Sequence, residues 1–162
     1  MVTFMQTNPM TKSGEKKIRD EIQRLKDIER PRIKTMIAEA RAHGDLKENA
    51  EYHAAKELQG MNEAKISAFE AKLKSAQIID ITQFKNEGKV IFGATITLEN
   101  LENNKTMTFQ IVGENESDIN QQKLSFAAPL SRAVIGKFCG DFVEASTPNG
   151  IIEYEIIAVD YI

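Results

Sequence analysis

The sequence is poor in the residues that support redox and zinc chemistry. Its 162 residues include one cysteine, Cys139, two histidines and no tryptophan. A lone cysteine excludes an internal disulfide, and so few thiols and imidazoles leave little for a zinc centre. No stretch approaches the roughly 20 apolar residues that span a bilayer, and the uncharged first ten residues lack the basic start and apolar core of a secretory signal. We therefore expect a cytoplasmic protein that has no contact with a membrane.

Charge is distributed unevenly along the chain. The formal net charge is −3, and 41% hydrophobic with 28% charged residues is typical of one or two folded domains. Residues 1–76 contain 15 Lys and Arg against 12 Asp and Glu, a net of +3, whereas residues 77–162 contain 6 against 12, a net of −6. This asymmetry predicts two domains, 1–76 and 77–162, with different partners.

Apolar residues of the first half recur at steps of three and four, the period of an amphipathic helix. Two segments, 11–42 and 46–76, share this pattern, and each would be about 45 Å long as a helix. Because only residues 43–45 separate them, we expect an antiparallel coiled coil, with a kink at Pro31. The predicted buried stripe is Ile18, Ile22, Leu25, Ile28, Ile33, Ile37 and Ala40, facing Ala50, Ala54, Leu58, Met61, Ile66, Phe69, Leu73 and Ala76.

The hairpin tip, residues 43–48, carries the sharpest signal. Gly44 suits the left-handed residue that ends a helix, and Asp45 with Glu48 has the spacing of a capping box for the next helix. The same two carboxylates are also hard oxygen ligands of the kind that Mg²⁺ prefers. Two carboxylates do not complete an octahedral shell, so other ligands would come from a partner or a substrate phosphate. Cap and metal ligand do not exclude each other.

The second half has the alternation and β-branched composition of strands. We expect strands at 90–98, 106–112, 142–146 and 151–159, with a hairpin turn at 148–150 and a short helix from Pro129 to Gly136. The predicted fold class is α+β: a long helical hairpin followed by a small antiparallel sheet curled around one helix.

Motifs spread over the whole chain resemble those of one family. The longest is the run GDLKENAEYHAAK from Gly44 to Lys56, and shorter ones lie at 9–11, 30–31, 38–41, 90–94, 129–130, 136–137 and 148–150. With them the sequence resembles the GreA/GreB family of bacterial transcription elongation (transcript cleavage) factors. The alternation of basic residues with Glu39, Glu51 and Glu57 is closer to the GreA type than to the larger basic patch of GreB.

The resemblance implies a partner and a role. Factors of this family insert their coiled coil through the secondary channel of bacterial RNA polymerase, when the nascent RNA 3′ end of a backtracked complex is extruded. Asp45 and Glu48 match the tip acids, which would help the polymerase hold a second Mg²⁺ and position the attacking water. The protein would be a monomer and no enzyme, would bind no cofactor alone, and would dock by an FKBP-like domain on the channel rim.

Residues near the tip are candidate contacts for RNA or polymerase. Lys34 and Arg41 lie seven apart, hence on one helical face, and could follow RNA phosphates together with Lys47 and Lys56. A solvated coiled-coil surface with ion pairs is the alternative for each of them. Tyr52 could stack on a displaced base or pack across the hairpin neck.

Two other functions are weighed against transcript cleavage. A channel-binding inhibitor on the same scaffold would be expected to alter the tip acids, whereas Asp45 and Glu48 are intact. A prolyl isomerase is suggested by fold analogy alone. Such enzymes commonly have a tryptophan floor in their pocket, and this chain has no tryptophan.

Overall fold

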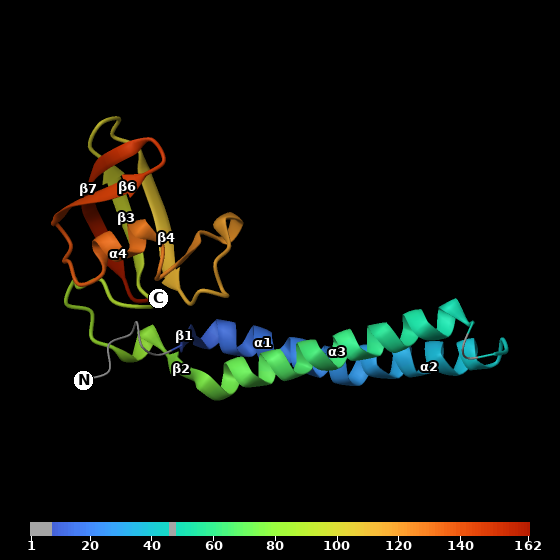
Figure 1. Ribbon diagram of the computed structural model, residues 1–162. Helices are drawn as coiled ribbons and strands as arrows, with labels where there is room; N and C mark the ends of the chain where they lie inside the picture. Colours follow the sequence, from blue (N-terminus) through green and yellow to red (C-terminus); the bar gives the residue numbers. More distant parts are fainter. Residues whose placement is uncertain (1–7, 46–47) are drawn as a thin grey trace. The chain divides into compact units, whose positions relative to one another are not determined.

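The computed structural model describes residues 8–45 and 48–162. Contacts gather in two compact units: residues 15–75 form a helical hairpin, and residues 8–14 with 76–162 form a unit around a curled β-sheet (Figure 1). This confirms the predicted α+β fold. The two domains that we expected, 1–76 and 77–162, remain a prediction. The compact units have a different boundary, because residues 8–14 belong to the unit of the sheet.

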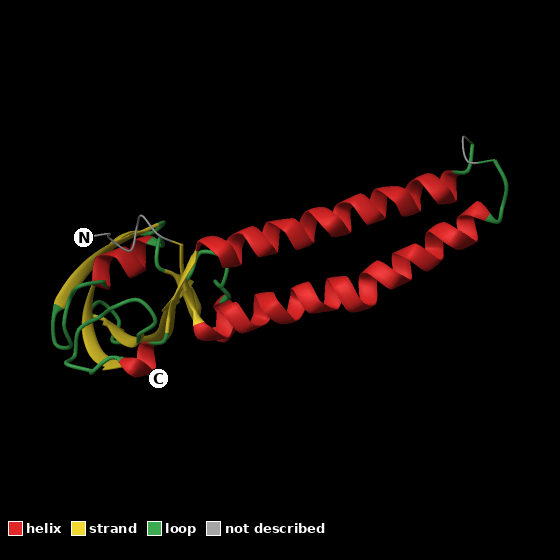
Figure 2. Cartoon of the chain, turned by 90° about the horizontal axis from the view of Figure 1, so that it is seen from below, coloured by secondary structure: helices red, strands yellow, loops and turns green. Residues whose placement is uncertain are grey.

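The hairpin consists of two long helical arms joined at the tip (Figure 2). The strands that precede and follow it pair in parallel, from Asn8 opposite Ala76 to Thr11 opposite Ile79. The hairpin is therefore the crossover connection that parallel strands require. None of the helices described is long and apolar enough to cross a membrane. In chain order the elements are β1 (Asn8–Thr11), α1 (Lys12–Arg24), a π-helical turn (Leu25–Glu29), α2 (Arg30–Arg41), α3 (Ala50–Ser75) and β2 (Ala76–Ile79).

The first arm has a π-helical turn directly before Pro31, the position at which we expected a kink. Leu25 and Ile33 are both buried in the seam, the surface along which the two arms pack together. Eight residues separate them, and in a regular α-helix this spacing places two side chains about 80° apart around the helix axis. The wider turn between them restores the phase, and as a result Ile28, predicted in the seam, is 61% exposed. Pro31 lies in the first turn of α2, directly after this distortion.

Ile66 is buried as predicted, but two buried positions of the second arm are each one residue later than predicted. Ala55 and Asn62 are 1% and 6% exposed, whereas Met61, predicted to be buried, is 52% exposed. The Asn62 side-chain amide donates to the Leu25 carbonyl at 3.3 Å, inside the π-helical turn. An irregular turn in one arm is thus matched by a buried polar residue in the other. Such a residue fixes the register of a coiled coil.

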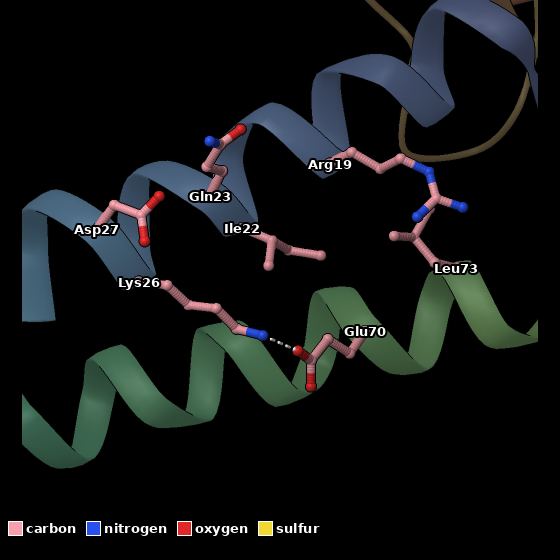
Figure 3. A pocket seen from close by; sticks show the side chains of 7 residues that line it. All are labelled: Arg19, Ile22, Gln23, Lys26, Asp27, Glu70 and Leu73. Atoms are coloured by element: carbon pink, nitrogen blue, oxygen red, sulfur yellow. Dashed lines mark hydrogen bonds and ion pairs between the residues drawn. The ribbon is translucent and has the colours of Figure 1, made fainter.

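Ion pairs between the arms border the seam. Lys26 Nζ lies 2.6 Å from Glu70 Oε1, and Arg30 donates two hydrogen bonds to the Glu63 carboxylate, at 2.7 and 2.9 Å. Figure 3 shows the first pair across a groove of about 420 Å³ whose floor includes Ile22. These charges lie on the surface, so each pair contributes little alone but adds to the register that the seam selects.

Besides the β1–β2 pair, the described residues of this unit form a five-stranded sheet in the order β5-β4-β3-β7-β6. All neighbours are antiparallel except β4 and β5, which are parallel. The sheet curls around a core that includes Ile96, Leu98, Ile111 and Ile156, all fully buried. In chain order the elements are a 3-10 turn (Ile81–Gln83), β3 (Thr95–Asn100), β4 (Thr106–Val112), a 3-10 turn (Ile119–Gln121), β5 (Lys123–Ser125), α4 (Pro129–Val134), β6 (Phe142–Thr147) and β7 (Gly150–Asp160).

The predicted strands need two corrections. The strand expected from residue 90 begins at Thr95, because the backbone turns at Gly93, whose φ of +89° favours glycine. The wholly antiparallel sheet that we expected has one parallel edge pair, formed by the three-residue β5. The helix and the last two strands lie within one or two residues of the predicted ranges.

Replacement of Asn62 by alanine should loosen the seam. Asn62→Ala removes the buried hydrogen bond to the Leu25 carbonyl, so we expect the free energy of unfolding to fall by about 1–2 kcal/mol. Urea unfolding followed by circular dichroism measures this, with Ser67→Ala on the exposed face of α3 as the control. Equal stability of the two variants would contradict a structural role for the bond.

The Arg30–Glu63 pair predicts a pH dependence of hairpin stability. The hydrogen bonds that Arg30 donates to Glu63 lower the pKa of the Glu63 carboxyl below its ordinary value of 4.5. A carboxyl with a lowered pKa stabilises the fold above its unfolded value, and that contribution is lost as the pH falls through the folded value. Thermal unfolding between neutral pH and about pH 3 should show a steeper fall in Tm for the wild type than for Glu63→Gln. Parallel Tm curves would contradict the prediction.

Candidate functional site at the hairpin tip

The helix ends at the tip are satisfied by backbone bonds and one asparagine. The last helical turn of α2 is closed by the Ala42 N–H, which donates to the Glu39 carbonyl at 3.1 Å, and Gly44 follows with a φ of +128°. Helix α3 begins at Ala50, and the Asn49 side-chain oxygen accepts the N–H of Tyr52 at 3.1 Å. Asn49 is therefore the N-cap of α3.

This cap corrects the capping-box prediction. A box made by Asp45 and Glu48 requires a helix that starts at residue 46, but α3 starts four residues later. Asn49 makes a second contact: its amide nitrogen donates to the Ala40 carbonyl at 2.5 Å, across the neck of the hairpin. One side chain thus caps α3 and joins the two arms, so capping does not require the acids.

Asp45 and Glu48 are both exposed, and both line a shallow recess of about 490 Å³ at the tip. His43 and Glu51 line it as well. Sequence reasoning missed these two residues as part of the site. Glu51 could have been found, because it follows Glu48 by three residues. The recess gathers carboxylate oxygens at the free end of the hairpin, where a cation held by another molecule could reach them.

The basic and aromatic candidates lie on both arms. Lys34 is exposed and borders a recess with Arg30 and Glu63 between the arms. The exposed Lys56 donates to Gln59 at 3.0 Å. Lys47 lies outside the described residues.

Tyr52 is engaged across the neck. Its half-buried ring lies 6.0 Å from the Arg41 guanidinium carbon and meets the His53 ring edge-on at 5.6 Å. The contact with Arg41, on the other arm, has the separation of a cation–π interaction. The packing alternative for Tyr52 therefore matches its observed contacts.

The sheet unit has an apolar recess of its own, about 530 Å³ in volume. It is lined by Met107, Ile119, Leu124 and Leu130 among others, and its one aromatic side chain among the described residues is that of Phe109. An isomerase pocket lined by several aromatic rings is therefore not present at this position.

Fold and site together define a class of protein: an α+β chain whose long helical hairpin presents exposed carboxylates at its tip. The model of the family "Transcription elongation factor, N-terminal" matches residues 8–78, and that of "Transcription elongation factor, GreA/GreB, C-term" matches residues 85–161. The chain therefore belongs to the GreA/GreB family of transcription elongation factors, as the sequence predicted.

Individual relatives cover nearly the full chain. Transcription elongation factor GreA of Legionella pneumophila (strain Corby) is 53% identical over 158 residues, which are 98% of this chain and 99% of the relative. The GreA factor of Francisella tularensis subsp. novicida (strain U112) is 54% identical over 153 residues, 94% and 96% of the two chains. Among solved structures, GreA factor homolog 1 (Gfh1) of Thermus thermophilus is 24% identical, with a TM-score of 0.41 over 95% of this chain and 99% of that one.

The assignment of the cap can be tested by stability. Asn49→Ala should lower the free energy of unfolding by about 1–2 kcal/mol, because α3 loses its N-cap and the arms lose a bond. Glu48→Ala should change it by less than about 0.5 kcal/mol, as expected of an exposed side chain. Urea unfolding of the two variants compares them directly. A larger loss of unfolding free energy for Glu48→Ala than for Asn49→Ala would contradict the assignment of Asn49 and support the capping box.

Proposed function

We propose that the protein stimulates cleavage of backtracked RNA by RNA polymerase and is itself no enzyme. The observation that carries this is the pair of exposed carboxylates, Asp45 and Glu48, at the end of a long helical hairpin. Asn49, not either acid, accepts the N–H of Tyr52 and caps the helix that follows them. Family membership supports the proposal, because GreA relatives are named as transcription elongation factors.

Mg²⁺ is the cation that this donor set suits. Carboxylate oxygens are its preferred protein ligands, and it usually keeps water or phosphate in the rest of its shell. Among the described residues no group of three or more potential ligands could hold a metal ion. Asp45 and Glu48 would therefore share an ion with the polymerase. Bound there, it would polarise the scissile phosphate and activate the attacking water.

Delivery to the polymerase depends on the arms. The first arm, residues 12–41, spans about 45 Å as a helix, long enough to reach a catalytic centre through a channel. The partner is bacterial RNA polymerase, entered through its secondary channel, and the target is the extruded 3′ end of the nascent RNA. Lys34, Arg41 and Lys56 are exposed on the arms and would contact RNA phosphates or the channel wall, as would Lys47.

Two alternatives have less support. An inhibitor that occupies the channel without supplying ligands would not need Asp45 and Glu48, and both acids are present and exposed. A prolyl isomerase would need a pocket lined by aromatic rings, and the recess of the sheet unit has only Phe109 among its described residues. This apolar recess, with Met107 and Ile119 on its rim, better suits docking on a protein surface.

Loss of the tip acids should slow cleavage strongly and leave polymerase binding intact. We expect Asp45→Ala with Glu48→Ala to slow the release of short 3′ fragments from backtracked polymerase on the order of 100-fold, the scale of losing a positioned charged group. Fragment release in Mg²⁺, with polymerase binding measured in parallel, checks this.

The matched control removes two carboxylates from elsewhere on the hairpin. Glu39→Ala with Glu57→Ala makes the same change in charge at exposed positions outside the tip recess and should retain cleavage. Free protein with Mg²⁺ and RNA should release nothing. Wild-type rates from the tip variant, or RNA cleavage by the free protein, would refute the proposed role.

A further inference from the structure

Both ends of the tip segment converge on one carbonyl group of the first arm. The Ala40 carbonyl oxygen accepts the backbone N–H of His43 at 3.2 Å and the side-chain amide of Asn49 at 2.5 Å. Ala40 is 3% exposed and lies in the last turn of α2. A carbonyl oxygen has two lone pairs, so it can accept from both sides at once. The segment that contains Asp45 and Glu48 is therefore closed at its base, within the hairpin unit alone.

Asn49 uses both halves of its side-chain amide for this closure. The oxygen accepts the N–H of Tyr52 and caps α3, while the nitrogen donates to Ala40 on the other arm. Asn49 is half-buried, so both bonds are partly shielded from water. Aspartate caps helices about as well as asparagine does, but an ionised carboxylate has no donor for a carbonyl oxygen. The bond to Ala40 therefore requires more of this side chain than capping does.

We propose that Asn49 is a positioning residue for transcript cleavage, acting through its bond to Ala40. The inference rests on the proposed function. Glu48 directly precedes Asn49, and Asp45 follows His43 by two residues. Each acid therefore lies one or two residues from a donor that is bound to the same carbonyl, and one residue spans at most about 3.6 Å. Without the Asn49 bond the segment loses its closure, and the two arms can separate at the neck.

A small separation is enough to affect the reaction. A misplacement of about 1 Å can cost about 100-fold in rate. Large movements are opposed by contacts nearby, because the Arg41 guanidinium lies 6.0 Å from the Tyr52 ring and Ala55 is buried in the seam. Loss of the bond should thus displace the acids and leave the hairpin folded.

The test uses three replacements that separate the two bonds of Asn49. Asn49→Ala removes both. Asn49→Asp keeps the acceptor for Tyr52 and removes the donor, and Asn49→Ser keeps a capping oxygen without added charge on a side chain too short to make both bonds. Cleavage by backtracked polymerase in Mg²⁺ is titrated with each full-length variant, to separate the maximal rate from the half-saturating concentration. The Tm of each variant is measured in parallel.

Two further measurements separate positioning from stability. Ile66→Val is the control, because it loosens the buried seam and lowers the Tm without touching the neck. Spin labels at Ala38→Cys and Ala54→Cys, exposed positions on opposite arms, report the distance between the arms near the neck. The labelled chains also carry Cys139→Ser, because the native cysteine is exposed.

All three Asn49 variants should lower the maximal rate at least about tenfold and leave the half-saturating concentration within about threefold. They should also broaden the distribution of distances between the arms. In Tm, by contrast, Asn49→Asp and Asn49→Ser should lie between the wild type and Asn49→Ala, because they keep the cap. Ile66→Val should cleave at the wild-type rate.

Three results would overturn the inference: wild-type cleavage by Asn49→Asp or Asn49→Ser, slow cleavage by Ile66→Val, or a lowered rate with an unchanged distance distribution. The first would assign any effect of Asn49→Ala to the cap, and the second would assign it to stability. Failure of the proposed function is distinguishable, because then the wild type itself releases no fragments.

Discussion

The tip depends on a division of labour between Asn49 and the two acids beside it. The first turn of any helix has backbone N–H groups without partners, and an acidic side chain is a common solution. Here Asn49 supplies the cap and also bonds the Ala40 carbonyl on the other arm. Asp45 and Glu48 precede the first residue of α3 and lie exposed in the tip recess. The neck is fixed by a neutral residue, so charge at the tip is available for chemistry.

Which residues meet at the neck is decided farther down the hairpin. The π-helical turn keeps Leu25 and Ile33 in one seam, and the bond from Asn62 to Leu25 ties that turn to α3. A slip of the arms would break this bond and separate Arg30 from Glu63. Because the arms are rigid helices, the register set here determines that Asn49 lies opposite Ala40 and Tyr52 opposite Arg41. The buried polar residue therefore acts on the tip through register.

Periodicity and turn residues predicted the two arms, the last two strands and the exposed acidic tip, because each of these follows from local pattern. The errors have physical causes that a local pattern does not contain. Ile28 has the spacing of a seam residue but is exposed, because the π-helical turn changes the helix phase there. In the other arm Asn62 is buried in the seam and Met61 is exposed. The Glu116 carboxylate accepts the N–H of Thr11, 105 residues away in the sequence, and no local pattern distinguishes it from other glutamates. Asn49 was missed as a cap because Asp45 offers an equally good local pattern.

The charges of the tip act locally. Over the length of the hairpin, about 45 Å, the field of a surface charge is screened, since the Debye length at physiological ionic strength is about 8 Å. Charges more than about 8 Å from the tip therefore contribute little to the electrostatic potential there. That potential is set by Glu48 and Glu51 and by the exposed basic groups of Arg41 and Lys56 on the neighbouring turns. Among the described residues Glu48 forms no ion pair with these cations, so its carboxylate oxygens stay exposed beside them.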